Sequence, residues 1–314
     1  MGFNVPVDHG GAGGGEPKRR RFSRRSVLIA GASGLGIAGF TAGTATGALP
    51  FSGAVQRALG VTSTTPVSQL GVAKVERVWS QARGREVDLV MLLPSKSPPP
   101  NLPMSLLLHG LHGRARTAPP TGTLAELGSQ VARRAVPPFG LVAVDGGDDY
   151  WHENHRGDDP MGMLLDEIPQ WLRRRGLGGA DGRPFAVTGM SMGGFGAMLY
   201  ARRLAERGIP VGALALLAPA LMLSWAEMAK RDAFHDEADW ASMDPLKHLE
   251  ATAGIPTGVW CGTEDAFIQG VRQYIAAARP AVAYTARGKH GDSFNRTVVP
   301  SVVSFLGSHV PPEQ

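Results

Sequence analysis

One serine, Ser191, stands in a glycine-rich turn between a short apolar run and a segment with a helical pattern. Residues 185–188 form the run, and residues 189–193 read GMSMG. The chain holds 42 glycines in 314 residues, so a G-x-S-x-G string can arise by chance and its context decides its meaning. A strand-to-helix turn forces such a serine outward, and it needs small residues two positions before and after. We therefore interpret this turn as a nucleophile elbow with Ser191 as the nucleophile.

The chain on both sides of the elbow alternates between strand and helix patterns, as a parallel α/β sheet does. Apolar runs such as LLL and ALALLAP are continuous, which is typical of strands covered on both faces. The expected strands are residues 75–79, 86–93, 105–108, 141–144, 185–188, 213–217, 258–261 and 282–285. The expected helices are residues 124–135, 161–175, 194–206, 268–278 and 298–306. Residues 219–252 interrupt the alternation and are expected to form a small cap.

The positive charge of the chain is concentrated at its N-terminus. Six basic and two acidic residues lie in 1–48, so this segment carries +4 of the net charge of +5. The remaining residues are nearly neutral, which excludes an electrostatic footprint for nucleic acid. The twin arginine Arg24-Arg25 precedes an uncharged Gly/Ala-rich stretch, which resembles a twin-arginine export signal or, alternatively, a membrane anchor.

These features predict three segments: a signal or anchor at 1–48, a linker at 49–73 and a catalytic domain at 74–314. The signal implies an exported protein, secreted or held in the cell envelope, and the export machinery as a partner. The single cysteine, Cys261, excludes an intrachain disulfide, and no cysteine near the signal could carry a lipid. A domain of this size can fold without disulfides.

An acid and a histidine follow the last two expected strands, in the order nucleophile, acid, histidine that this kind of elbow requires. Glu264 and Asp265 come after the strand at 258–261, and His290 comes after the strand at 282–285. We choose Asp265 over Glu264 because the fourth position of a G-x-x-D turn commonly points inward. His290 would take the proton from Ser191, and Asp265 would orient His290.

The oxyanion hole of such a site needs two backbone N–H groups. The residue after the nucleophile, Met192, supplies one, and Leu111 in the turn after the strand at 105–108 is expected to supply the other. His109 and His112 flank Leu111 and are expected to line the substrate pocket. They could instead be turn residues or a metal pair, but two histidines without a third ligand are weak support for a metal. No metal or cofactor is expected.

The loop after the fourth expected strand reads DGGDDYWHENHRGDD, residues 145–159. It lies at the end of the sheet where α/β folds bind ligands, so Tyr150, Trp151 and His152 are expected to line the pocket, with a solvated loop as the alternative. The histidines are too close together for an H-E-x-x-H zinc helix, and the acid spacing lacks the glutamate that ends a calcium loop.

Residues 72–308 resemble the putative-esterase group of α/β hydrolases, which contains esterase D (S-formylglutathione hydrolase) and the antigen 85 mycolyltransferases. The resemblance rests on the following motifs, in this order: LLLHGLHG, VAVDGGDDYW, LLDEIPQWL, VTGMSMGGFGAM, CGTEDAF and GKHGDSF. It implies an α/β-hydrolase fold, with a mostly parallel sheet and helices on both faces. It also implies Ser191, Asp265 and His290 as the triad, with Leu111 and Met192 as oxyanion donors.

Two departures separate the chain from the mycolyltransferases of that group. His-Gly-Leu stands where those enzymes have Asp-Gly-Leu, and Asp265 agrees with esterase D, whereas they use a glutamate. The expected function is therefore a serine ester hydrolase that forms an acyl-enzyme and acts on a small or lipid acyl ester. The alternatives are an envelope acyltransferase with a sugar or glycolipid acceptor, and a binding protein on an inactive hydrolase scaffold.

Overall fold

The computed structural model describes residues 71–312. The expected export signal at 1–48 lies outside these residues, as does most of the expected linker. Within residues 71–312 no helix is both long and apolar enough to cross a membrane. The first strand begins at Val72, three residues earlier than expected, so the end of the expected linker belongs to the sheet.

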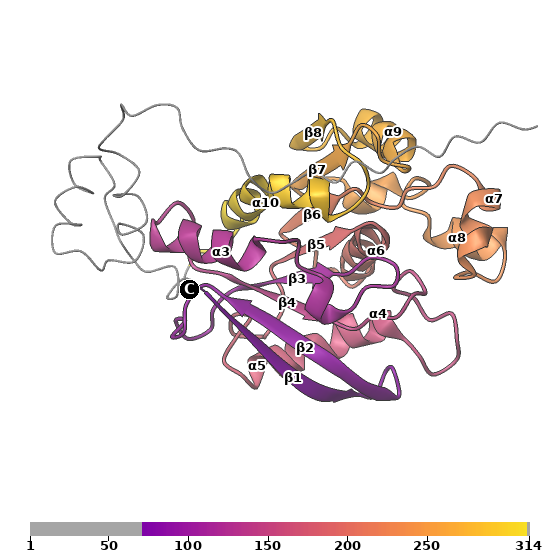
Figure 1. Cartoon of the computed structure of the whole chain (residues 1–314). Helices are drawn as coiled ribbons and strands as arrows, with labels where there is room; N and C mark the ends of the chain where they lie inside the picture. Colours follow the sequence, from indigo (N-terminus) through magenta and orange to yellow (C-terminus); the bar gives the residue numbers. More distant parts are fainter. Residues whose placement is uncertain (1–70, 313–314) are drawn as a thin grey trace, which may run out of the picture. The chain divides into compact units, whose positions relative to one another are not determined.

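Eight strands form a single sheet in the order β1-β2-β4-β3-β5-β6-β7-β8 (Figure 1). The strand β2 is antiparallel to both of its neighbours, and all other neighbouring strands are parallel. The carboxyl ends of β3 to β8 therefore meet at one edge of the sheet. The strands are β1 Val72–Ser80, β2 Arg85–Leu93, β3 Met104–Leu108, β4 Gly140–Val144, β5 Ala186–Met190, β6 Ala213–Leu217, β7 Thr257–Gly262 and β8 Val282–Ala286.

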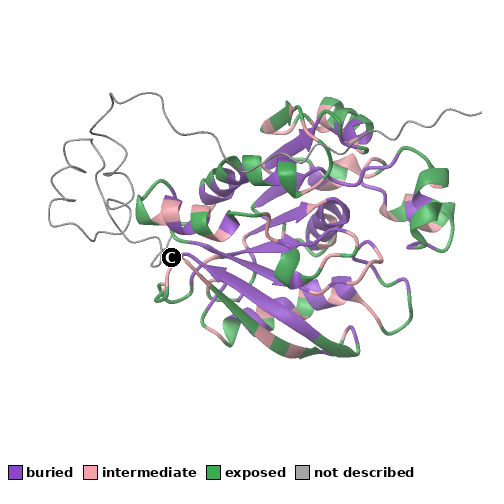
Figure 2. Ribbon diagram, in the orientation of Figure 1, coloured by how far each residue is buried: buried purple, intermediate pink, exposed green. Residues whose placement is uncertain are grey.

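Helices cover both faces of this sheet because its central strands carry apolar residues that point to each face in turn. In β3, Leu106 and Leu108 join the core under α6, whereas Leu107 joins the core under α3 and α10. The six strands from β2 to β7 are buried along nearly their whole length, whereas β1 and β8 are largely exposed (Figure 2). The helices are α3 Thr123–Ala132, α4 Pro160–Gly162, α5 Ile168–Arg173, α6 Met192–Glu206, α7 Trp225–Met228, α8 Glu237–Met243, α9 Ile268–Ala278 and α10 Asp292–Gly307.

Two of the expected helices differ from the structure. The helix expected at 161–175 is divided into α4, a π-helical turn at Met163–Glu167, and α5. Pro169 explains the division, because it has no N–H to continue the α-helical hydrogen bonding through this point. The last helix begins at Asp292, six residues earlier than expected, so the residues after His290 that were expected to be a loop are helical.

The expected cap at 219–252 consists of α7, α8 and two short 3₁₀ turns between β6 and β7 (Figure 1). Trp225 of α7 stacks on Trp240 of α8 with ring centroids 6.2 Å apart, which holds the two helices together. The side chain of Phe234 joins the main core, since only 7% of this residue is exposed. The cap is therefore packed on the domain at Phe234.

Candidate active site

Ser191 lies where β5 turns sharply into α6. Its backbone has φ 56° and ψ −121°, a conformation that costs a residue with a side chain on the order of 1–3 kcal/mol. Two of its hydrogen bonds join the turn to β6 and the chain after it: the Ser191 N–H donates to the Leu217 carbonyl (3.0 Å), and the Ala220 N–H donates to the Ser191 carbonyl (2.9 Å). The hydroxyl is placed at the carboxyl edge of the sheet and makes no hydrogen bond to any of residues 71–312.

Gly189 and Gly193 stand where backbone segments touch. A methyl group on Gly189 would overlap the carbonyl of Gly193, and one on Gly193 would overlap the end of β3 and lie 2.7 Å from the His109 carbonyl oxygen. Carbon atoms do not approach backbone oxygens that closely, so only glycine fits at either position. The close approach of α6 to the ends of β5 and β3 explains the G-x-S-x-G spacing physically.

Asp265 and His290 meet although 25 residues separate them, because the parallel strands β7 and β8 end side by side. His290 Nδ1 lies 2.7 Å from Asp265 Oδ2, and Asp265 Oδ1 accepts the N–H of Phe267 (2.9 Å). The Asp265 side chain is fully buried, and 32% of the His290 side chain is exposed. An ionised carboxylate only accepts hydrogen bonds, so Nδ1 carries the proton and Nε2 is left free to accept one.

Glu264, the other candidate acid, lies apart from His290. Its Oε1 accepts a hydrogen bond from Arg287 Nε (2.8 Å), and the Arg287 side chain is 91% exposed. Such an exposed ion pair contributes little to stability. Of the two neighbouring carboxylates, Asp265 is the one in contact with the imidazole.

The N–H groups of Leu111 and Met192 donate no hydrogen bond to residues 71–312. Met192 is the first residue of α6, and Leu111 lies in a four-residue turn that the Gly113 N–H closes on the Gly110 carbonyl (2.9 Å). This turn lies against Ser191, since a β-carbon on Gly110 would be 3.3 Å from the Ser191 β-carbon. Free N–H groups beside a serine can stabilise an oxyanion.

His109 joins this turn to the loop after β4 through hydrogen bonds. It was expected to line a pocket, but its ring is buried instead. The Gly146 N–H donates to His109 Nε2 (2.9 Å), and the Nδ1 proton is donated to the Gly110 carbonyl (2.8 Å). The Trp151 indole N–H donates to the His109 carbonyl (3.3 Å). Burial lowers the pKa of His109, which favours the neutral ring, and the two hydrogen bonds fix the roles of its nitrogens.

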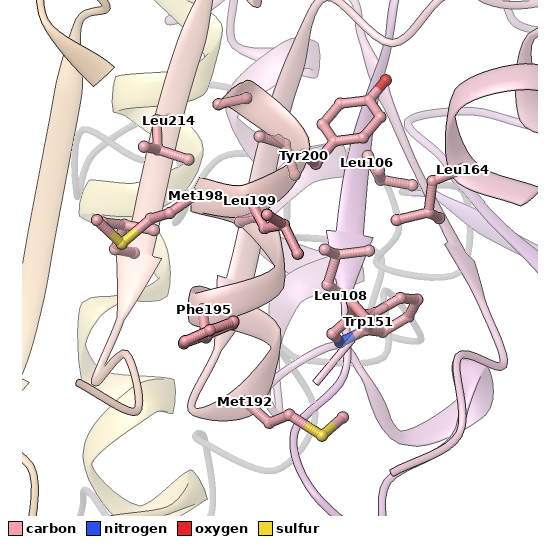
Figure 3. Packing of buried hydrophobic residues seen from close by; sticks show 14 of the residues in the cluster. Leu106, Leu108, Trp151, Leu164, Met192, Phe195, Met198, Leu199, Tyr200 and Leu214 are labelled. Atoms are coloured by element: carbon pink, nitrogen blue, oxygen red, sulfur yellow. The ribbon is translucent and has the colours of Figure 1, made fainter. Parts of the chain in front are cut away.

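Tyr150 and Trp151 are packing residues, contrary to the expectation that they line an open pocket. They are 1% and 0% exposed, and the indole occupies space that a methyl group on Gly146 or Gly196 would need. Figure 3 shows Trp151 close to Leu108 at the end of β3. Large aromatic groups at the ligand-binding edge of a sheet can fill either the core or a pocket, and here the adjacent glycines let them enter the core.

His152 and His112, the remaining pocket candidates, lie in different surroundings. His152 stacks on Phe234 of the cap (centroids 4.5 Å apart), its Nε2 donates to the Ala233 carbonyl (2.7 Å), and burial lowers its pKa. It also borders a surface cavity of about 360 Å³ that Ser191 does not line. The side chain of His112 is 81% exposed and contacts Asp148 beside the turn that carries Leu111. His109 is buried with both ring nitrogens hydrogen-bonded, whereas His112 is exposed, so the two side chains lie in different surroundings.

Two charged residues that support the site were not among the expected ones. Asp145, directly after β4, accepts the N–H of Ala115 (2.8 Å) through one oxygen and that of Asp88 (3.0 Å) through the other. Arg83, 4% exposed, donates to the Asp145 carbonyl (2.6 Å) and pairs with Asp158 (2.6 Å). Asp145 could have been found from the sequence, because it is an acid directly after a buried strand. The residues around Arg83 give no such indication.

This sheet order, with a serine elbow after β5, defines an α/β-hydrolase fold. The profile of the family described as "Putative esterase" matches residues 80–271, and the chain belongs to that family. It is therefore a serine esterase. The comparison with curated protein sequences gave no significant match.

Three solved structures illustrate the likeness of fold. An S-formylglutathione hydrolase from Agrobacterium tumefaciens superposes with a TM-score of 0.60 at 18% identity, covering 80% of this chain and 99% of that one. A ferulic acid esterase gives 0.59 at 14% identity, covering 77% and 100%. A thermostable carboxylesterase cloned from a metagenomic library gives 0.58 at 17% identity, covering 82% and 95%. At sequence identities this low, the structures show the fold that is shared and do not indicate the substrate.

Proposed function

We propose that this esterase hydrolyses carboxylic esters through Ser191, His290 and Asp265 by way of an acyl-enzyme. His290 Nε2 takes the proton of the Ser191 hydroxyl as its oxygen attacks the ester carbonyl. The N–H groups of Leu111 and Met192 stabilise the oxyanion. His290 then protonates the departing alcohol, and water resolves the acyl-enzyme by the same steps in reverse order.

The observation that carries this proposal is the 2.7 Å contact between His290 Nδ1 and the buried carboxylate of Asp265. It fixes the tautomer that leaves Nε2 available, and it lies at the sheet edge where Ser191 stands. The acid beside the histidine is an aspartate in this chain and a glutamate in the mycolyltransferases. This difference also favours hydrolysis over mycolyl transfer.

The test is turnover of a series of p-nitrophenyl esters from acetyl to palmitoyl, with Ser191→Ala in parallel. Turnover and labelling by a fluorophosphonate should be lost in Ser191→Ala and kept in Ser304→Ala, a control at an exposed serine on α10. The chain-length optimum would size the acyl site. Turnover in Ser191→Ala equal to that of the wild type would refute the proposal. Labelling of the wild type without turnover of any ester would favour an acyl acceptor other than water.

Acyl transfer is tested in the same reaction by adding a sugar acceptor. Partition of the acyl group to the sugar at a constant rate of p-nitrophenol release would identify a transferase. Absence of partitioning at high acceptor concentration would leave hydrolysis as the reaction. A folded protein that is neither labelled nor active would be a binding scaffold.

We also propose that the protein is exported and acts on an ester of the cell envelope or its surroundings. The support is Arg24-Arg25 ahead of an uncharged Gly/Ala-rich stretch, together with the near neutrality of the rest of the chain. Replacing both arginines by lysine should retain the protein inside the cell. Fractionation checks this, and recovery of the wild type in membranes instead of the medium would indicate that the segment is kept as an anchor.

A further inference from the structure

The turn that carries Leu111 contains a conformationally strained residue. His112 is the third residue of the turn closed between Gly110 and Gly113, and its φ is 59°. Glycine is favoured at this position of a turn with positive φ, because a β-carbon there meets the backbone. A contact from outside the turn would stabilise His112 in this conformation.

Asp148 makes the contact that holds it. Its Oδ1 accepts the His112 N–H at 2.6 Å, and its Oδ2 lies 3.2 Å from His112 Nδ1. The two side chains are 81% and 41% exposed, so their ion pair by itself adds little. The hydrogen bond from the backbone to a charged oxygen is the stronger element. It holds His112 in the conformation in which the Gly113 N–H reaches the Gly110 carbonyl, and that carbonyl shares a peptide group with the Leu111 N–H.

Leu111 is thus bracketed by contacts with the loop after β4. On its N-terminal side, His109 is fastened to Gly146 and Trp151. On its C-terminal side the contact is Asp148, and the N–H of Leu111 between them is left free. A hydrogen-bond donor has to be held within a few tenths of an ångström to stabilise a developing charge.

We propose that Asp148 is a positioning residue of the oxyanion hole, which holds His112 in its left-handed conformation and so aims the Leu111 N–H at the reacting carbonyl oxygen. This inference rests on the proposed function, because it assigns a role in the same reaction. Its consequence is a loss of transition-state stabilisation without a loss of substrate binding.

The experiment compares Asp148→Ala with Asp181→Ala on p-nitrophenyl acetate. Asp181 is a matched control, since it is exposed and its carboxylate also accepts a backbone N–H (Arg183, 3.0 Å), but it precedes β5 at the opposite end of the strand from Ser191. We expect Asp148→Ala to lower kcat by about 10- to 100-fold, somewhat less than removal of an oxyanion donor, with KM within about twofold. Asp181→Ala should leave both unchanged.

A second substitution distinguishes a positioning role of Asp148 from a direct effect of its charge. His112→Gly in the Asp148→Ala background should restore most of kcat, because glycine adopts positive φ without a partner. The loss of a merely electrostatic effect of the carboxylate would not be rescued. Failure of the glycine to restore kcat would therefore overturn the proposal.

Amide hydrogen exchange supplies a readout that does not depend on turnover. Exchange over residues 109–117 should rise in Asp148→Ala and stay at the wild-type level in Asp181→Ala. Unchanged exchange, or a kcat within twofold of wild type, would overturn the proposal while leaving the esterase mechanism intact. Turnover that survives Ser191→Ala would overturn the mechanism instead, and exchange would still decide whether Asp148 holds the turn.

Discussion

Replacing Asp265 by asparagine tests the orientation of His290. The oxygen that accepts the Phe267 N–H must remain an acceptor, so the new amide nitrogen takes the place of Oδ2, 2.7 Å from His290 Nδ1. The amide N–H then donates to Nδ1, which moves the imidazole proton to Nε2. In that tautomer His290 cannot accept the Ser191 proton.

The expected loss in kcat is about 10⁴-fold, which corresponds to ~5 kcal/mol of transition-state stabilisation. The matched control is Glu264→Gln, whose partner Arg287 is 91% exposed, and its kcat should stay within about twofold of wild type. Steady-state turnover of p-nitrophenyl acetate measures both variants, and circular dichroism checks that both are folded. Equal losses, or a larger loss in Glu264→Gln, would show that the reasoning from the Asp265 contact is wrong.

Three further predictions concern stability. Gly193→Ala should cost about 3 kcal/mol or more of unfolding free energy, or prevent folding, because its methyl group would overlap the end of β3; urea unfolding near wild type would contradict this. Phe234→Ala should cost about 3–5 kcal/mol in the same assay, since its buried ring packs in the main core, and a small effect would show a loosely packed cap. Burial lowers the pKa of His109, so the folded state resists its protonation and stability should fall as the pH drops below about 6.5. Thermal unfolding across pH should show a weaker decline in His109→Gln, and an identical decline would refute this assignment.

Much of the fold could be predicted because its strands are buried on both faces. Runs such as Leu106 to Leu108 leave no polar face, and only a sheet covered by helices on both sides accommodates them. Boundaries were less predictable where local chemistry overrides the pattern. Pro169 divides one expected helix, and α10 begins at Asp292 within residues that are too polar to signal a helix.

The parts of the site that depend on the order of the strands could be predicted from the sequence. The parts that depend on side-chain packing could not. The structure brings Asp265 and His290 together as expected, because both follow neighbouring parallel strands. Three of the residues expected to line the pocket, His109, Tyr150 and Trp151, are instead buried. Trp151 enters the core because Gly146 and Gly196 leave room for it, and no local pattern shows that these three residues meet.

The exposure of β8 has a consequence for how the protein loses function on heating. This strand pairs with β7 alone and is half-exposed or exposed along its length, so it belongs to the part of the sheet that opens at the lowest free energy. His290 follows it directly, whereas Ser191 follows the buried strand β5. Local fraying of one edge would therefore separate His290 from Ser191 while the core stays folded. Heat should abolish turnover at a lower temperature than it melts the sheet, and brief inactivation should reverse on cooling.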